Sequence, residues 1–169
     1  MSVGMSPVFR LQCNQMETSD EDQYEKRPRA GLIPYLRDES GVYHYLMMVS
    51  SNPKFGGPRP MISKGKIEDG EGTLECAIRE AEEELGLVRE NMIGDPFFLV
   101  EERVVLRSGA YDLTVYAVPI QDRWNFDKWC DETEFTVWMP LESFKEKGRK
   151  DHIPYVEMLE AHLIGSKEN

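Results

Sequence analysis

The chain has 169 residues, 40% of them hydrophobic, and a formal net charge of −11. This length suits one domain with a full core, and the acidic balance argues against a protein that coats nucleic acid with a basic face, so we expect no DNA binding. A phosphate-bearing substrate remains compatible with the charge if a divalent cation neutralises the site.

The three cysteines, Cys13, Cys76 and Cys130, lie far apart and form no CxxC pair. A scattered, odd set is typical of a reducing compartment without structural disulfides. The N-terminus lacks a signal-like apolar core, and no apolar run reaches membrane-spanning length. We therefore expect a cytoplasmic protein without membrane association, either a monomer or a homodimer.

Residues 1–28 are mixed in composition and form the first predicted segment. The stretch Thr18–Arg29, which overlaps the end of this segment, is acidic in its first half and basic in its second. Such charge runs rarely bury enough surface to order themselves, which favours a solvated tail or loop. The alternative is a lid or a dimer arm. Residues 29–169 are the predicted domain.

Two strands are expected next, Ala30–Leu36 and Val42–Ser50, separated by a turn at residues 38–41. The second is nearly all apolar, so it should lie inside the sheet. Asn52–Pro60 holds three prolines and two adjacent glycines and is predicted to be a loop. Met61–Ile67 is predicted as a short extended segment interrupted at Gly65.

Thr73–Leu85 is the clearest helix. Its apolar residues recur at helical spacing and make one stripe: Leu74, Ala77, Ile78, Ala81 and Leu85. Thr73 is the expected N-cap, and Gly86 the expected C-terminal stop.

The remaining predicted elements are three strands followed by two helices. Strands are predicted at Phe97–Leu106, Tyr111–Ile120 and Glu134–Met139, and helices at Leu141–Lys147 and Pro154–Ile164. Strands mixed with a central and a terminal helix favour an α/β or α+β sandwich.

Glu80, Glu83 and Glu84 stand at i, i+3 and i+4, so their carboxylates crowd one side of the central helix. Like charges at this spacing repel, and the C-terminal half of a helix disfavours anions. A hard divalent cation with oxygen ligands would reverse that cost. The alternative is a solvated acidic face, but the preceding loop, punctuated by Gly65, Gly70 and Gly72, lets main-chain groups approach a ligand closely.

The segment Gly65–Leu87 resembles the Nudix box: Gly, five residues, Glu, seven residues, Arg-Glu, an apolar residue, any residue, Glu-Glu, any residue, Gly and an apolar residue. The constrained positions are filled by Gly65, Glu71, Arg79, Glu80, Ala81, Glu83, Glu84, Gly86 and Leu87, with Ala81 small for its aliphatic position. A softer resemblance extends from Arg29 to the terminal helix and includes Phe135–Leu141.

This resemblance implies a single-domain α/β/α sandwich with a mixed sheet and a magnesium-dependent hydrolase in which manganese can substitute. Its implied reaction is cleavage of a nucleoside diphosphate linked to another moiety. By the same resemblance, Glu80 and Glu84 are metal ligands with Glu83 as a third, and the main-chain carbonyl of Lys64 or Gly65 adds a ligand. Arg79 then orients neighbouring carboxylates, and Glu71 braces the loop.

In this family the general base comes from the box or from a downstream loop. The downstream candidates are Glu132 and Glu134, followed by Glu101, Glu102 and Asp112. For each of them the alternative is an ordinary surface carboxylate.

The approach Met61–Lys66 resembles the Pro-Lys-Gly-Lys approach of members that act on dinucleoside polyphosphates, phosphorylated inositols or RNA 5′ ends, although Ser63 replaces the proline. Lys64 and Lys66 could neutralise additional phosphates, or be plain surface cations. The alternatives are an ADP-ribose or nucleotide-sugar pyrophosphatase, and a Nudix module that binds a nucleotide without cleaving it.

Further candidates are weaker. Six aromatic residues could stack a nucleotide base or pack in the core: Tyr35, Tyr43, Phe55, Tyr111, Trp124 and Trp129. The basic run Lys145–Lys150 could meet phosphates, or form a solvated helix end. His44, His152 and His162 have no metal-ligand spacing and are expected to be structural, as is Cys76.

Overall fold

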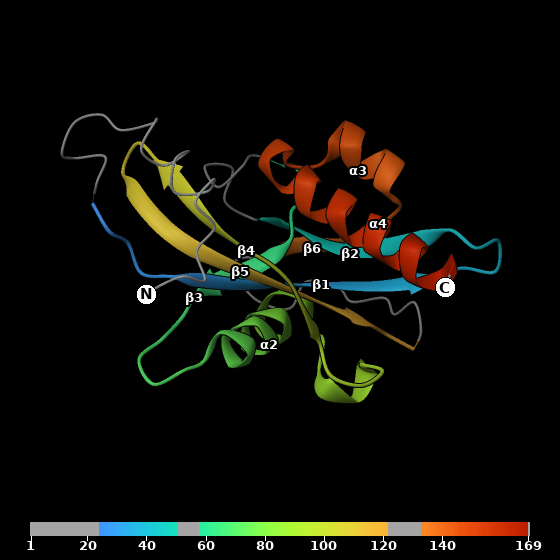
Figure 1. Ribbon diagram of the computed structural model, residues 1–169, viewed down its shortest axis with the longest axis horizontal. Helices are drawn as coiled ribbons and strands as arrows, with labels where there is room; N and C mark the ends of the chain where they lie inside the picture. Colours follow the sequence, from blue (N-terminus) through green and yellow to red (C-terminus); the bar gives the residue numbers. More distant parts are fainter. Residues whose placement is uncertain (1–23, 51–57, 122–132, 169) are drawn as a thin grey trace.

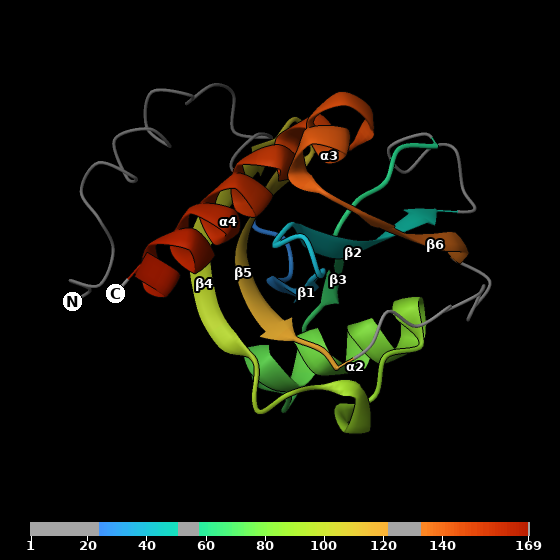
Figure 2. The same cartoon turned by 90° about the vertical axis from the view of Figure 1, so that its right-hand side faces the viewer.

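The computed structural model describes residues 24–50, 58–121 and 133–168. One mixed sheet forms the middle layer, with helices on both of its faces (Figures 1 and 2). The sheet contains β1 (Arg29–Arg37), β2 (Tyr43–Ser50), β3 (Ser63–Lys66), β4 (Phe97–Leu106), β5 (Gly109–Pro119) and β6 (Thr133–Met139). Helix α2 (Thr73–Leu85) covers one face, and α3 (Leu141–Lys147) and α4 (Ile153–Glu168) cover the other; η2 (Arg89–Asn91) and η3 (Lys150–His152) are single turns. This confirms the predicted α/β/α sandwich.

The strand order is β4-β5-β1-β2-β6, and β3 pairs with β1 outside this path. Among the strands named above, which lie within the described ranges, β1 and β5 pair in parallel and the other pairs are antiparallel. Strand β2 lies between β1 and β6, as its apolar sequence predicted.

One edge of β1 is shared by two partners. Strand β3 pairs with Arg29–Leu32, and β2 pairs with residues from Tyr35 onward. Pro34 lies between these two stretches, and a proline has no N–H to donate to a ladder. The sheet therefore forks at Pro34, which explains how its central strand accommodates a proline.

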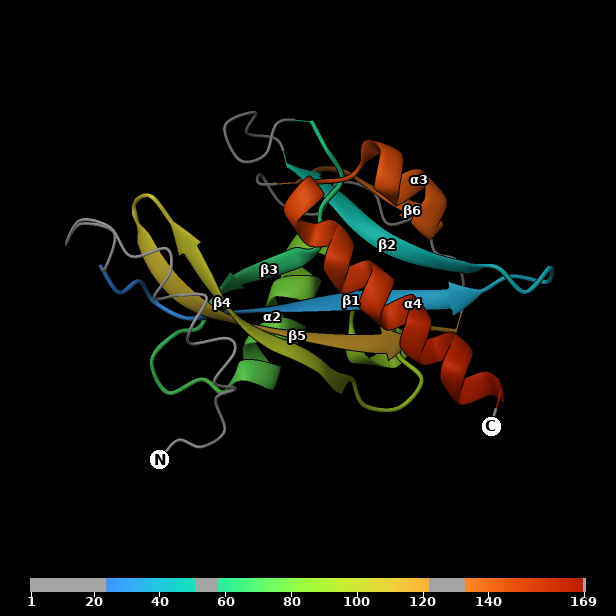
Figure 3. The same ribbon diagram turned by 45° about the horizontal axis from the view of Figure 1, so that its top comes forward.

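Alternation along the strands divides the core in two. Leu32 and Leu46 pack with Ala77 and Leu85 on the α2 side, whereas Ile33 packs with α3 and α4 residues on the other side. Figure 3 shows α4 running across β1 on the face opposite α2. Residues on either side of one strand thus reach two separate environments.

Two local predictions were wrong. The N-cap of α2 is Gly72, whose amide donates to the Glu75 carboxylate at 2.7 Å, while the Thr73 hydroxyl bonds to that of Tyr116 at 2.6 Å. In addition, β3 continues through Gly65 without interruption, because it is held in register with β1 on both sides of that residue.

Residues 24–28 are attached to the sheet. The amide of Lys26 donates to the Ala110 carbonyl at 2.7 Å, and the Ala110 amide donates to the Tyr24 carbonyl at 2.8 Å. The sequence predicts a solvated tail or loop here, and the contacts that attach this stretch come from a strand far along the chain. Residues 1–23 lie outside the described residues, so a lid or dimer arm stays a prediction.

None of the helices in the described ranges is long and apolar enough to cross a membrane.

Candidate active site

Helix α2 buries two carboxylates together with its apolar stripe. Cys76, Ala77 and Ala81 are fully buried, and Glu80 and Glu84 retain only 9% and 7% of their exposure. Burying a charged group is costly unless opposite charge or hydrogen bonds compensate it. The surroundings of these two side chains therefore decide what the site can do.

Arg79 is the centre of the carboxylate cluster. Its Nε lies 2.7 Å from Glu71 Oε2, and its Nη1 lies 3.0 Å from Glu80 Oε2 and 3.3 Å from the Glu83 carboxylate. Its Nη2 donates to the Lys66 carbonyl at 3.0 Å. The hydrogen bond from Arg79 lowers the pKa of Glu71 to about 2, so Glu71 is ionised at neutral pH. One guanidinium thus ties the loop, the helix and β3 together.

Gly65 faces this cluster from β3. A Cβ at Gly65 would lie 2.0 Å from the carboxyl carbon of Glu80, so only glycine leaves room for that carboxylate. One residue earlier, the Lys64 amide donates to Glu84 Oε1 at 3.1 Å. The carboxylates of Glu80 and Glu84 therefore both lie against the backbone of β3.

The donor set fits a hard divalent cation. Four carboxylates, those of Glu71, Glu80, Glu83 and Glu84, gather around the single guanidinium of Arg79 or beside it. Carboxylate oxygens are the ligands that magnesium and calcium prefer. Within the described ranges, no group of three or more acidic, histidine or cysteine side chains has the arrangement that would hold a metal ion directly. Arg79 holds three of the carboxylates, and the Lys64 amide holds the fourth.

Lys64 and Lys66 flank Gly65, the first residue of the box, but their side chains lie on the sheet face opposite α2. Because neighbouring residues in a strand point to opposite faces, Gly65 faces α2 while the two lysines face the α4 side. Burial and the charges of Arg29 and Arg149 lower the pKa of Lys64 to about 8. Lys66 is exposed.

The family model described as "NUDIX domain" matches residues 25–159 of the chain. The chain belongs to this family. Nudix enzymes hydrolyse phosphorus-containing anhydrides and generally use divalent cations, and the intact carboxylate cluster agrees with the predicted class of hydrolase.

Solved structures share the fold at low identity. A Caenorhabditis elegans Ap4A hydrolase in a binary complex has a TM-score of 0.70 and 18% identity, covering 83% of this chain and 99% of its own. The Nudix domain of Shewanella oneidensis NrtR, complexed with ADP ribose, has a TM-score of 0.69 and 13% identity, covering 94% and 99%. The structure of Shewanella oneidensis NrtR complexed with a 27mer DNA has a TM-score of 0.61 and 14% identity, covering 80% of this chain and 61% of its own. No curated protein matches the chain.

The predicted downstream bases of this Nudix domain differ in their surroundings. Thr133 docks on the box helix, since its hydroxyl donates to the Glu84 carbonyl at 2.9 Å in a buried contact. Glu132 lies outside the described residues, and the side chain of Glu134 is likewise not described. Both flank a residue that touches the box, and their role stays a prediction.

The other three candidates lie on the neighbouring strands β4 and β5. Asp112 accepts from Arg103 at 3.0 Å, and Glu102 accepts from the Tyr155 hydroxyl of α4 at 3.3 Å. Glu101 is exposed on β4. Asp112 and Glu102 are thus engaged by partners outside the Nudix box.

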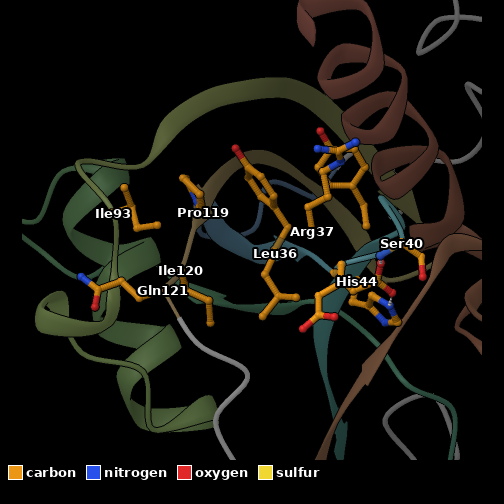
Figure 4. Close-up of a pocket in the computed structure, with 12 residues that line it drawn as sticks. Leu36, Arg37, Ser40, His44, Ile93, Pro119, Ile120 and Gln121 are labelled. Carbon is orange, nitrogen blue, oxygen red and sulfur yellow. Dashed lines mark hydrogen bonds and ion pairs between the residues drawn. The ribbon is translucent and has the colours of Figure 1, made fainter.

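A cavity of about 830 Å³ lies away from the box, at the C-terminal end of β1 (Figure 4). Leu36, Ile120 and the β1–β2 turn line it, and none of its lining residues belongs to the box. Asp38 in this turn accepts from the amides of Ser40 and Val42 and pairs with His44 at 2.9 Å. These polar groups stabilise the turn, so we do not assign the Nudix chemistry to this cavity.

Cys76 packs beneath β3. Its Sγ lies 3.5 Å from the Gly65 carbonyl, and burial raises the pKa of the thiol to about 12. A thiol that stays protonated at neutral pH fits the expected structural role.

Proposed function

We propose that this protein is a magnesium-dependent pyrophosphohydrolase that cleaves a nucleoside diphosphate linked to another moiety. Manganese can substitute for magnesium in this proposal. Dinucleoside polyphosphates and RNA 5′ ends are the favoured substrate classes. The observation that carries the proposal is the carboxylate cluster around Arg79, with Glu80 and Glu84 buried against β3.

Glu80 and Glu84 would hold the cation, with Glu83 as a third carboxylate and the carbonyl of Lys64 or Gly65 as a main-chain ligand. When bound, the cation neutralises phosphate charge and lowers the pKa of water. Arg79 restrains Glu71, Glu80 and Glu83 through its three nitrogens. Glu71 in turn accepts from the Glu68 amide at 2.9 Å and so braces the loop before the helix.

The reaction adds water across one phosphoanhydride bond. The water oxygen bonds to phosphorus, the bridging P–O bond breaks, and a carboxylate accepts the water proton. The box carboxylates are candidates for this base, and so are Glu132 and Glu134 beside the docked Thr133. The products are a nucleoside monophosphate and a second phosphorylated fragment.

Two observations bear on the substrate. The approach to the box places Lys64 and Lys66 in β3, on either side of Gly65, where the β3 backbone meets the carboxylates of Glu80 and Glu84. Lysines near a metal site pair well with additional phosphates. The fold also resembles an Ap4A hydrolase. The second candidate, ADP-ribose, is supported by the comparable likeness to a Nudix domain complexed with it.

A substrate panel tests the proposal. Diadenosine tetraphosphate, ADP-ribose, NADH, nucleoside triphosphates and 5′-triphosphorylated RNA are incubated with the protein and magnesium, and products are separated by chromatography. We expect turnover of at least one polyphosphate substrate, lost on chelation and in Glu84→Gln. Tight binding without turnover of any compound would instead favour a non-catalytic nucleotide-binding module.

A further inference from the structure

We propose that Arg29, Lys64 and Arg149 form a phosphate-binding site on the sheet face opposite α2, hereafter the cationic face. The identity of its ligand, the part of the substrate's phosphate chain that extends beyond the cleaved anhydride, rests on the proposed function. The existence of an anion-binding site at the cationic face does not depend on the proposed function. The cationic face contains none of the Nudix box carboxylates.

The fold brings these three residues together from distant parts of the chain. Arg29 opens β1 and pairs with Lys66, while Gly31, two residues later on the same face, pairs with Lys64. A Cβ at Gly31 would lie 2.6 Å from the Ser63 carbonyl oxygen and 3.0 Å from the Lys64 Cβ, so a glycine here lets β3 and Lys64 approach β1 closely. Arg149 precedes η3, and its amide donates to the Pro60 carbonyl at 2.8 Å, just before β3.

Arg29 is held in place but not satisfied. Its guanidinium carbon lies 4.5 Å above the centre of the Tyr111 ring, which fixes the group by a cation–π contact. Its Nε is buried and has no hydrogen-bond partner among the residues that the structure describes. A buried donor without a partner is costly, and an anionic oxygen is the acceptor that would gain most from it.

The charges around Lys64 are also unbalanced. Arg29 and Arg149 are the cations whose charges act on its ammonium group. The acids nearby are Asp151, which is hydrogen-bonded to Arg149 at 2.7 Å, and Glu84, which belongs to the box. In a chain of net charge −11, three converging cations repel one another unless an anion joins them.

The chemistry points to phosphate rather than to an isolated carboxylate. Two planar guanidinium groups and one ammonium offer donors from several directions, which suits a tetrahedral oxyanion. Lys64 also joins the two sites, because its amide contacts Glu84 while its side chain lies on the cationic face. A phosphate chain at the box can therefore continue past Lys64, whereas a substrate with only two phosphates has fewer groups to offer.

Inorganic tripolyphosphate is the probe that separates this site from catalysis. Its binding to the full chain is measured by titration calorimetry in EDTA, where the box carboxylates carry no cation and repel polyanions. We expect Arg29→Gln and Arg149→Gln each to weaken binding at least about tenfold. Lys150→Gln, the matched control, removes an exposed charge next to Arg149 and should change binding less than about twofold. Urea titration of each variant verifies that it is folded.

The two proposals fail in different ways. One outcome is weakened tripolyphosphate binding in the variants, combined with no turnover of any panel substrate. This outcome would support the cationic face and contradict the proposed hydrolase. Turnover in the wild type, with tripolyphosphate binding unchanged in both arginine variants, would overturn the cationic face. Equal losses in Lys150→Gln would also overturn it, because the effect would then be general charge. In an active enzyme, Arg149→Gln should lower kcat/KM at least tenfold more for diadenosine tetraphosphate than for ADP-ribose.

Discussion

At the scale of single residues, Gly65 makes a sharp prediction. Adding a methyl group there drives it into the Glu80 carboxylate that Arg79 holds in place. We expect Gly65→Ala to lower the free energy of unfolding by about 1–3 kcal/mol, as overpacking does, and to lower kcat by two orders of magnitude or more. Chemical denaturation and steady-state kinetics measure the two effects.

The controls for Gly65→Ala come from the same chain. In a Glu80→Ala background the substitution should cost little stability, because the clashing carboxylate is gone. Gly165→Ala, in open space on α4, should be neutral or slightly stabilising. A Gly65→Ala penalty that persists unchanged without Glu80 would show that the clash is not its cause.

His152 makes a prediction about pH. It is 2% exposed, its Nδ1 accepts from the Ile62 amide at 3.2 Å, and burial with the charges of Lys64 and Arg149 lowers its pKa to about 3 despite the opposing charge of Asp151. As the pH falls, His152 in the unfolded chain therefore binds a proton at a higher pH than His152 in the folded protein. Its contribution to stability is complete above pH 6.5 and is lost as the pH falls toward 3, by at most about 1.4 kcal/mol per pH unit.

His152→Asn removes the titrating group and retains an acceptor for the Ile62 amide. We expect unfolding measured from pH 7 to pH 4.5 to give a smaller loss of free energy in this variant than in the wild type, even if the variant is less stable at pH 7. Parallel pH profiles in the two proteins would mean that His152 is protonated in the folded state as readily as in the unfolded chain.

At the scale of elements, the contact between β6 and α2 links the downstream segment to the box. Thr133→Val keeps the size of the side chain and removes the hydrogen bond to the Glu84 carbonyl. We expect a loss of about 1 kcal/mol in the free energy of unfolding. If Glu132 or Glu134 is the base, Thr133→Val should also lower kcat by a larger factor than it raises KM.

Glu132→Gln and Glu134→Gln complete that test through the pH dependence of kcat. Removing the base should abolish the acidic limb of the profile in one variant and leave it intact in the other. An intact acidic limb in both variants would return the role of base to the box carboxylates.

The elements themselves could be predicted where the sequence carries a local pattern. Helix α2 begins and ends at the predicted residues, because its apolar stripe has a period of 3.6 and Gly86 adopts the left-handed conformation that ends it. The ends of β1, at Arg29 and Arg37, were missed because pairing with β3 and β2, rather than hydropathy, extends the strand. The resemblance to the Nudix box, rather than a local pattern, implied that Arg79 orients neighbouring carboxylates, and Arg79 contacts those of Glu71, Glu80 and Glu83.

The cationic face could not be predicted in the same way. Lys64 and the run containing Arg149 were candidates separately, but nothing in the sequence indicated that they lie near Arg29. Register between β1 and β3, together with the bond from Arg149 to Pro60, brings them to one place. Strand alternation, once β3 is known to continue through Gly65, is what separates the lysines from the box helix.

At the scale of the whole molecule, the carboxylates around Arg79 couple the cation to folding. Because the folded site gathers charges that the unfolded chain spreads apart, magnesium should bind the folded state preferentially. At a hundred times its dissociation constant, the cation should add about 2.7 kcal/mol to the free energy of unfolding. Thermal or urea unfolding with increasing magnesium measures this gain, and no gain at any concentration would contradict the site.

Glu84→Gln is the matched variant for this measurement. The new amide oxygen can still accept from the Lys64 amide, and the repulsion from Glu80 is removed. We expect the variant to be at least as stable as the wild type in EDTA, to gain much less from magnesium, and to lose most turnover. A magnesium gain equal to that of the wild type would exclude Glu84 as a ligand of consequence.

The parallel pairing of β1 with β5 also sets the order in which the chain can fold as it is synthesised. Strands β1, β2 and β3 leave the ribosome within the first 66 residues and can pair with one another at once. The other edge of the central strand must wait for Gly109–Pro119, and the face opposite α2 waits longer still, for α3 and α4. Such long-range pairing is slow and leaves apolar surface uncovered in the meantime. A nascent chain halted before Pro119 should therefore carry the complete box on an unfinished sheet. Expression conditions that slow aggregation should raise the yield of folded protein.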